Sequence, residues 1–400
     1  MFENLADGTW LTRTRVRAIC VMMLVVTLAM LVRLFANAHG TLDSQGRPLG
    51  TDFAAFWSAG HMALEGHAAS AWDWRSIAGV HAATHGAQAA KDNFVSWHYP
   101  PPFLLVASLA ALLPYVWGLI IWQAASFAPA AWLAHRIVPG RDAVLAILAF
   151  PAILICFGHG QNGFLTATLL GGGLLLLDRR PILAGALLGC LVYKPQFALV
   201  LPLVLLAGGH WRAILAAAAS ALLLTALTLA LWGWPVWQAF LDSLPLARSV
   251  LIERGLIGWE KIQSAFAAVR MWGGSIPLAY AVQSLVTIAA ILGAAIGARV
   301  ADANVRAALA ITAVLLATPY VIDYDLVALG MALVFLVADG RARGFLRWEK
   351  SLYAFAWITP LVARGIAGAL HLPLGLIAIA TVFVLAARRG LAFRSSPSRR

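Results

Sequence analysis

Apolar runs near the length that crosses a bilayer constrain this chain more than any other feature. They cover residues 18–37, 116–135, 211–232, 276–298 and 371–387. A helix needs about 20 mostly apolar residues to cross the hydrocarbon core of a membrane. The composition agrees, because 62% of the residues are hydrophobic and 12% are charged, against about 45–50% and about 25% in soluble domains. We therefore expect an all-α, polytopic transmembrane protein.

Shorter apolar stretches alternate with prolines. These stretches are residues 100–113, 143–157, 181–193, 196–207 and 326–338, and the prolines that break or border them are Pro114, Pro151, Pro181, Pro195, Pro202 and Pro319. Broken helices at membrane depth are tolerated only where protein or a water-filled cavity lines them. We expect half-helices around a cavity and 12 or 13 spans, with 12 favoured and one short segment entering without crossing.

The basic residues predict the orientation. The net charge of +12 comes in short clusters between apolar runs: Arg13, Arg15 and Arg17; Arg179 and Arg180; Arg299 and Arg306; Arg341, Arg343, Arg347 and Lys350; and Arg388, Arg389 and the tail to Arg400. This pattern is typical of cytoplasmic loops and not of nucleic-acid binding. Both termini are therefore expected in the cytoplasm, in a single integral membrane domain over residues 1–400 with a basic cytoplasmic tail at 389–400.

Two long loops are expected on the extracytoplasmic side, at residues 38–98 and 233–275. They contain eight tryptophans: Trp57, Trp72, Trp74, Trp97, Trp234, Trp237, Trp259 and Trp272. Tryptophan at this density fits an aromatic belt at the membrane interface and also fits stacking against sugars. The sequence leaves both interpretations open.

Asp52 is the acidic residue that most needs an explanation, because it lies where the first outer loop leaves the membrane. A carboxylate at the rim of a bilayer costs free energy unless it is paired or used. Asp52 is interpreted either as the N-cap of a short helix over the following residues or as a general base facing the outer side. The two roles are compatible.

Other polar residues gather where the apolar stretches break. They are His98 and Tyr99, His159 and Gln161, Lys194, and Tyr320, Asp323 and Asp325. We expect these breaks to share one outward-facing cavity with Asp52. A lone lysine between apolar half-helices, as at Lys194, must either pair or extend to the interface. The two late aspartates are candidates for binding a divalent cation, positioning an acceptor, or pairing with outer-loop arginines.

The order of these motifs resembles that of glycosyltransferase family 87, the mannosyltransferase-like, polyprenyl-phosphate-dependent membrane enzymes of the GT-C class. The resemblance runs from about residue 50 to residue 340: Asp-Phe after the first span, Tyr-Pro-Pro, Gly-x-Gly-Gln, Lys-Pro and a late Thr-Pro-Tyr. It implies transfer of a mannose-like hexose or a pentose from a polyprenyl-phosphate donor to a lipid or glycan acceptor, with inversion, on the extracytoplasmic face of the inner (plasma) membrane. By position Asp52 matches the essential aspartate of the class. The family's late histidine is replaced here by Asp323 and Asp325.

This chemistry assigns expected roles to the remaining candidates. A leaving phosphate needs preorganised cations or N–H donors, and we expect Lys194, Gln161 and Arg254 to supply them, with Arg33, Arg248 and Arg270 as alternatives to Arg254. The residues expected to position the acceptor or substrate are His98, Tyr99, His159, Tyr320, Asp323 and Asp325. No cofactor and no metal site are expected, a divalent cation being the less favoured alternative.

A secondary transporter, or a flippase for a lipid-linked intermediate, is the main rival. Broken helices with embedded lysine and aspartate are also typical of ion-coupled transport sites. Such transporters usually have two related halves, whereas the large aromatic loop at 38–98 has no counterpart of similar length in the second half. The sugar, the acceptor and the linkage are not specified by the sequence.

Overall fold

Long apolar helices form the outside of the molecule. The computed structural model describes residues 2–92, 95–198 and 200–393. Six helices are long and apolar enough to cross a membrane: α2 (Arg13–Ala36), α7 (Tyr115–Ile137), α14 (Trp211–Trp232), α17 (Ile276–Val300), α20 (Glu349–Leu370) and α21 (Leu374–Ala392). The pair α8 (Arg141–Leu148) and α9 (Pro151–His159), bent by 44°, makes a seventh when counted as one span. The described residues contain no β-strand, which confirms the all-α class.

Shorter helices fill the space between the long ones. They are α6 (Pro101–Ala111), α10 (Gly163–Leu176), α11 (Pro181–Gly189), the 3-10 turn η2 (Cys190–Tyr193), α12 (Pro195–Ala198), α13 (Leu201–Ala207), α18 (Ala303–Ala317), the 3-10 turn η5 (Asp323–Asp325) and α19 (Leu326–Arg343). Prolines occupy the first turn of α6, α9, α11 and α13, where a missing N–H costs no hydrogen bond. The predicted half-helices are confirmed, while the count of about 12 spans stays a prediction.

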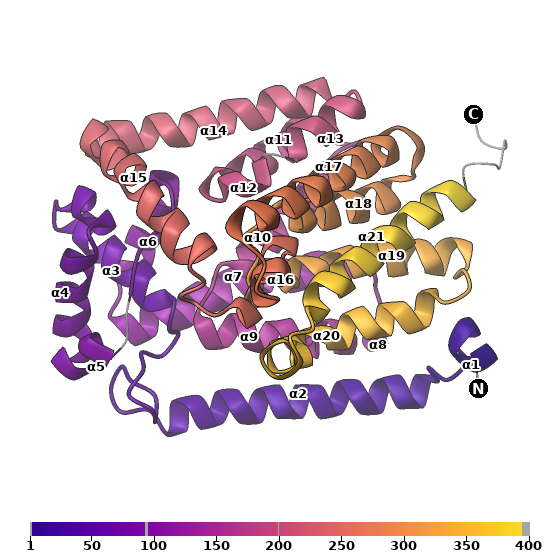
Figure 1. Cartoon of the computed structure of the whole chain (residues 1–400), viewed down its shortest axis with the longest axis horizontal. Helices are drawn as coiled ribbons and strands as arrows, with labels where there is room; N and C mark the ends of the chain where they lie inside the picture. Colours follow the sequence, from indigo (N-terminus) through magenta and orange to yellow (C-terminus); the bar gives the residue numbers. More distant parts are fainter. Residues whose placement is uncertain (1, 93–94, 199, 394–400) are drawn as a thin grey trace.

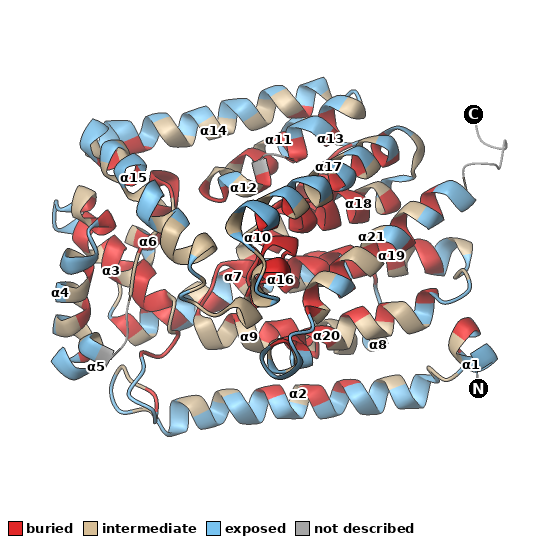
Figure 2. Ribbon diagram, viewed as in Figure 1, coloured by how far each residue is buried: buried red, intermediate tan, exposed pale blue. Residues whose placement is uncertain are grey.

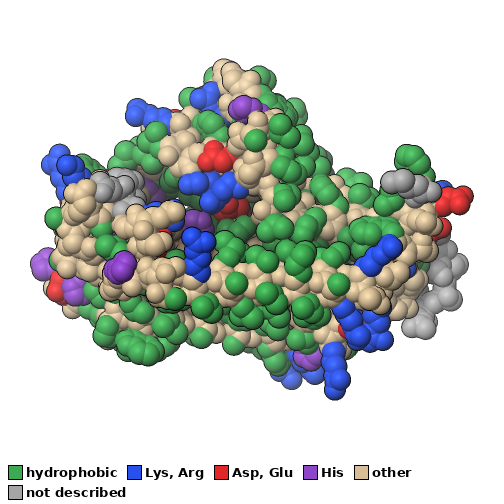
Figure 3. Space-filling model, turned by 90° about the horizontal axis from the view of Figure 1, so that it is seen from below, with side chains coloured by type: hydrophobic (Ala, Val, Ile, Leu, Met, Phe, Trp, Pro, Cys, Tyr) green, Lys and Arg blue, Asp and Glu red, His purple; other side chains and the backbone are tan. Residues whose placement is uncertain are grey.

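Helix α18 forms the centre of the core. Nearly all its residues from Val305 to Ala317 are buried, and it packs against α10, α17, α19 and α21. Figure 2 shows burial concentrated on α10, α18 and α19, while α2 and α14 expose most of their side chains. Seen from the side of α2, hydrophobic side chains cover most of the surface (Figure 3). This distribution is typical of a helical bundle whose outer helices face lipid.

The elements of the two loops lie apart from the chain termini. The first loop contains α3 (Phe53–Leu64), the 3-10 turn η1 (Ala68–Trp72), α4 (Trp74–His85) and α5 (Ala87–Asp92). The second contains α15 (Trp234–Ala247), the π-helical segment η3 (Arg248–Glu253), the 3-10 turn η4 (Trp259–Lys261) and α16 (Ala265–Met271). Figure 1 shows α3, α4, α5 and the start of α15 at one end of the molecule, opposite α1 (Phe2–Asp7) and the end of α21.

The predicted cytoplasmic clusters meet at that opposite end. The contacts that join them are Arg13–Asp142, Arg17–Asp142, Arg306–Asp178, Arg341–Pro139, Arg343–Asp302, Arg343–Asp339, Arg389–Asp339, Arg389–Glu349 and Arg388–Arg347. We call this region the basic end. Residues 394–400 of the predicted basic tail lie outside the described residues. One shared basic end fits the positive-inside rule, and its sidedness stays a prediction.

The segment from Pro181 to Ala207 enters and leaves at the basic end. Its start follows Asp178, which pairs with Arg306, and its last carbonyl, that of Ala207, accepts a hydrogen bond from Arg299. Helices α11 and α13 therefore form a hairpin with both ends at the basic end (Figure 1). Lys194 lies at its turn, between η2 and α12. A Cβ atom at Gly189 would lie 2.1 Å from Ser220 Oγ, so glycine allows α11 to approach the backbone of α14.

Single-cysteine labelling tests the orientation of this arrangement. We expect Ser44→Cys, in the exposed first loop, to react with an impermeant maleimide in intact cells. We expect Ala342→Cys, exposed at the basic end, to react only after the membrane is opened, because positive-inside loops stay in the cytoplasm. Both variants would be made on a background lacking the native cysteines. Labelling of position 342 but not of position 44 in intact cells would reverse the orientation.

Candidate active site

Asp52 precedes α3, but its side chain does not cap that helix. Its backbone is already helical, with φ −87° and ψ −23°, and the carboxylate accepts no hydrogen bond from the first turn. A capping residue normally has extended backbone, which folds its side chain back over the helix. Instead Asp52 Oδ2 accepts a hydrogen bond from Gln161 Nε2 at 2.9 Å. The N-cap interpretation of this carboxylate is therefore wrong, and the group is available for chemistry.

The turn that ends α9 carries Gln161, the partner of Asp52. Gly160 ends the helix in the left-handed conformation, with φ +67°. A Cβ atom at this position would lie 2.6 Å from Phe53 Cβ, so only glycine allows the turn to approach the start of α3. There the Asp52 N–H donates to the carbonyl of His159 at 3.0 Å. Backbone and side chain together fix the turn against the aspartate.

Gln161 orients the carboxylate through its own hydrogen bonds. It is buried, and its Oε1 accepts from the Tyr99 hydroxyl at 3.2 Å and from the Asn162 N–H at 2.9 Å. With its oxygen occupied, the amide presents its NH₂ group to Asp52. Tyr99 comes from the loop before α6, so three separate segments determine where the Asp52 carboxylate points.

His159 links Asp52 to an arginine on α20. Arg364 Nη2 lies 3.4 Å from His159 Nε2, and since a guanidinium only donates, Nε2 accepts and the ring proton is on Nδ1. Nδ1 lies 2.8 Å from Thr51 Oγ1, which in turn donates to Asp52 Oδ1 at 3.3 Å. The result is a directed chain from Arg364 through His159 and Thr51 to the carboxylate.

This environment keeps Asp52 ionised. Burial favours the neutral acid, but His159, Gln161 and Thr51 outweigh it and hold the pKa of the Asp52 carboxyl below the ordinary 3.8. The side chain is 35% exposed, so a substrate hydroxyl can reach it. An accessible carboxylate that stays charged at neutral pH satisfies the first requirement of a general base.

Arg364 is a functional candidate that the sequence analysis did not single out. It lies in a candidate span, where a charge is costly unless it is used or paired, and this is the signal that would have found it. Its Nε and Nη2 bond to Asp323 Oδ2 at 2.8 and 2.7 Å. Its side chain is 38% exposed, and within the described residues its Nη1 has no partner. The guanidinium is therefore held by Asp323 and His159 while its Nη1 stays available to a ligand.

Lys194 pairs with protein and does not extend to the interface. It is 3% exposed, and its Nζ lies 2.5 Å from Asp325 Oδ1. The other oxygen of Asp325 accepts the Ile322 N–H at 3.2 Å. The late aspartates thus face different cations, Asp323 with Arg364 and Asp325 with Lys194, and neither pairs with an outer-loop arginine. In the described ranges, no three or more His, Cys, Asp or Glu side chains gather as a metal site.

The remaining candidates are distributed unevenly around this centre. Tyr320 lies close enough to Asp52 and Asp325 to interact with them electrostatically. His98 bonds to Ser96 at 2.7 Å, and burial lowers its pKa to about 4. Arg254 is exposed after η3. In the part of the chain that the structure describes, no hydrogen bond or ion pair joins the side chains of His98 and Arg254 to the Asp52 cluster.

The fold and this cluster define a multi-helix membrane protein with a solvent-reached carboxylate held beside paired cations. Residues 97–319, more than half of the chain, match the model of glycosyltransferase family 87. The chain belongs to glycosyltransferase family 87, which assigns it to the glycosyltransferases and not to the transporters. Comparisons with curated proteins and with solved structures gave no match. The matched range includes Tyr99, His159, Gln161 and Lys194, while Asp52 and Arg364 lie outside it.

A double-mutant cycle tests the role of the Lys194–Asp325 pair. Lys194→Met leaves a buried carboxylate without its cation and should lower the free energy of unfolding by about 3–5 kcal/mol. Adding Asp325→Asn removes that charge, keeps an acceptor for the Ile322 N–H, and should restore most of the loss. Thermal unfolding of the purified variants measures both effects.

The control for this cycle is the exposed pair of Arg248 with Glu253, where Arg248→Met should change stability little. If the single and the double variant were equally unstable, the charge pair would not be the source of the loss.

Proposed function

We propose that this protein transfers a mannose-like hexose or a pentose from a polyprenyl-phosphate donor to a lipid or glycan acceptor. The reaction would take place at the extracytoplasmic face of the inner (plasma) membrane, as part of building the cell envelope, with the basic end and both termini in the cytoplasm. The observation that carries the proposal is the Asp52 carboxylate, accessible, ionised and oriented by Gln161 and the Arg364–His159–Thr51 chain. Family membership supports the reaction class.

In the proposed reaction Asp52 acts as the general base. Each carboxylate oxygen has two lone pairs, so an oxygen that accepts from Gln161 or Thr51 can still take the proton of an acceptor hydroxyl. At the same time the hydroxyl oxygen attacks the anomeric carbon. The bond from that carbon to the phosphate oxygen breaks, and the polyprenyl phosphate leaves with the electron pair. Because attack and departure occur on opposite faces, the anomeric configuration inverts. General-base help of this kind contributes about 10²–10⁴-fold to the rate.

Arg364 is the best-placed cation for the donor phosphate. A leaving phosphate gains negative charge and is stabilised by fixed donors already in place. The charge of Lys194 is matched by Asp325 in a buried pair, whereas Arg364 keeps a free, partly exposed edge beside His159. We therefore assign the direct phosphate contact to Arg364, with Gln161 and Lys194 supporting the site from behind. Arg254 is the less favoured candidate for this contact, because it lies exposed after η3.

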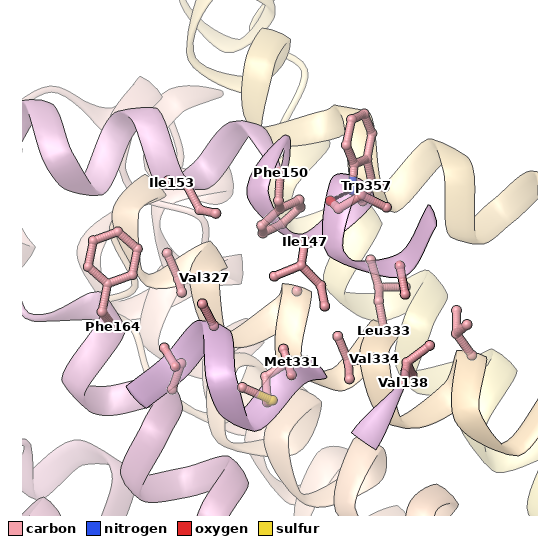
Figure 4. Close-up of a pocket in the computed structure, with 18 of the residues that line it drawn as sticks. Val138, Ile147, Phe150, Ile153, Phe164, Val327, Met331, Leu333, Val334 and Trp357 are labelled. Atoms are coloured by element: carbon pink, nitrogen blue, oxygen red, sulfur yellow. Dashed lines mark hydrogen bonds between the residues drawn. The ribbon is translucent and has the colours of Figure 1, made fainter. Parts of the chain in front are cut away.

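An apolar cavity of about 240 Å³ supports a lipid-linked donor. Figure 4 shows it extending between Phe164, Ile153 and Val327 on one side and Val138 and Val334 on the other. Val327 lies two residues after Asp325, and Phe164 two residues after Asn162, so one end of the cavity lies beside the polar cluster. Its lining is almost entirely apolar, with Asp142 and Arg341 at the basic end, and such a lining suits a hydrocarbon chain.

Asp52→Asn tests the catalytic assignment. We expect this variant to fold and insert as the wild type does, since an amide still accepts the hydrogen bond of Gln161. Because an amide cannot take the acceptor's proton, sugar transfer should fall by at least about 10²-fold. Donor affinity should change little, since the base acts chiefly in the transition state. The measurements are transfer, donor binding and thermal unfolding of the purified variant.

Asp73→Ala is the matched control for Asp52→Asn. Asp73 does cap its helix, accepting the N–H groups of Arg75 and Ser76, so its loss should lower stability and leave transfer unchanged. A stable Asp52→Asn protein that transferred sugar at the wild-type rate would move the base to another carboxylate.

Arg364→Lys tests the phosphate contact. The ammonium keeps the positive charge but loses the planar fork that holds Asp323 and a phosphate together. We expect the KM for the polyprenyl-phosphate donor to rise about 10-fold or more, with a smaller change in kcat. Arg254→Lys should leave the donor KM unchanged. An unchanged donor KM in a folded Arg364→Lys protein would argue against the contact.

A further inference from the structure

A second, smaller hollow lies beside the last turns of α20, beyond Arg364. Its volume is about 140 Å³, and it is lined by Trp259 and Glu260 of η4, Met271 at the end of α16, Ala367 and Gly368 of α20, and His371, the residue that follows α20. None of these residues takes part in the Asp52 cluster. We call this hollow the η4 pocket.

The η4 pocket lies about one helix turn from Arg364. Residues at i and i+4 lie on the same side of a helix, so Arg364 and Gly368 are neighbours on one face of α20. At a rise of about 1.5 Å per residue, Gly368 lies about 6 Å beyond Arg364 along the helix axis. A molecule bound in the pocket therefore lies next to the helix turn that carries Arg364.

Hydrogen bonds also join the η4 side of the pocket to the active site. Directly after η4, Ile262 pairs with Ile322 in an isolated bridge, and the Gln263 N–H donates to the Val321 carbonyl at 2.7 Å. Ser264 Oγ donates to the Pro319 carbonyl at 2.7 Å. The segment that carries Trp259 and Glu260 is thus tied to the break that carries Asp323.

Polar groups in the pocket have no protein partner. The Glu260 carboxylate and the Trp259 indole N–H make no hydrogen bond or ion pair within the described residues. The Trp259 ring is nevertheless fixed, because Gly255 lies against it and the Arg270 guanidinium is 5.5 Å from its centre. The Glu260 carboxylate can accept, and the indole N–H of the fixed Trp259 can donate, hydrogen bonds to neighbouring hydroxyl groups of a sugar.

The backbone conformation of His371 is also typical of a ligand-binding residue. It ends α20 in the left-handed conformation, with φ +53°, where a side chain is strained and glycine is the usual residue. In the described chain, only Trp348 is another non-glycine residue with positive φ. Strain of this kind persists at ligand sites when the side chain is needed. The exposed Gly368, in the last turn of α20, places no side chain between Glu260 and His371.

We propose that the η4 pocket is a saccharide subsite for the acceptor. It would bind the sugar ring next to the ring whose hydroxyl reacts at Asp52, through Glu260, the Trp259 N–H and His371. This inference rests on the proposed function, since it needs a glycosylated acceptor at Asp52. It makes the acceptor a glycan or glycolipid of at least two sugar units.

The experiment measures binding of octyl glycosides to the protein in phospholipid nanodiscs. The probes are octyl mannoside, glucoside and galactoside, each compared with the corresponding octyl disaccharide, by titration calorimetry. We expect one disaccharide to bind the wild type about 10-fold or more tighter than its monosaccharide, as hydrogen bonds to a charged group provide. Glu260→Gln should remove most of that advantage and leave monosaccharide binding unchanged.

Two further variants keep the test specific. His371→Gly should raise the unfolding temperature, because glycine suits the left-handed position. The same variant should weaken disaccharide binding. If His371 had only a structural role, the variant would be more stable and its disaccharide binding would not change. Asp242→Asn removes an exposed acidic charge from α15. This control should change neither the unfolding temperature nor disaccharide binding.

The proposal is overturned if no disaccharide binds tighter than its monosaccharide, or if Glu260→Gln and His371→Gly bind as the wild type does. Loss of disaccharide binding on adding a chelator would instead identify a cation site at Glu260 and His371 and would also overturn it. Failure of the proposed function is separate, because full transfer by Asp52→Asn would refute the base while leaving the binding result in place.

Discussion

Buried charges at the break between α18 and α19 can exist only as pairs, and this constraint organises the rest of the structure. Isolated charges lose several kcal/mol of solvation inside a bundle that faces lipid. Asp323 and Asp325 lie two residues apart, yet each requires its own cation. Arg364 comes from α20 and Lys194 from the turn of the α11–α13 hairpin. These pairs tie both α20 and the hairpin to the break between α18 and α19.

Apart from Arg364, which lies inside α20, the site is built from turns and helix ends. His159 and Gln161 flank a left-handed glycine, Asp52 stands at a helix start, and Tyr99 lies in the loop before α6. Backbone groups at such positions are free to bond across segments, as the Asp52 N–H does with the His159 carbonyl. The helices hold these segments in place, and the breaks between the helices bring the polar side chains together.

The sequence alone was sufficient to predict the helices and much of the cluster. Apolar runs, prolines and lone polar residues depend on local composition, so the half-helices and the neighbourhood of Asp52, Gln161 and Tyr99 could be anticipated. A charge inside an apolar span marks Arg364 as a candidate, but its partner His159 is 205 residues away and no local pattern encodes the pairing. The cap interpretation of Asp52, one of the two left open by the sequence, failed for a related reason. Residue type favours capping, but the amide of Gln161, 109 residues later, offered a different hydrogen bond.

The hairpin of α11 and α13 has a consequence for how the protein is made. Lys194 meets its counter-ion only 131 residues later in the chain, and at about 5–20 residues per second of synthesis the ammonium waits on the order of ten seconds for it. A segment that crossed the bilayer would have to carry that uncompensated charge through it. Both ends of this hairpin lie at the basic end. With that end in the cytoplasm, as proposed above, the hairpin can stay on the side of the ribosome and insert once the α18–α19 break has been synthesised. We therefore expect the hairpin to be among the last parts of the bundle to assemble, although it lies in the middle of the sequence.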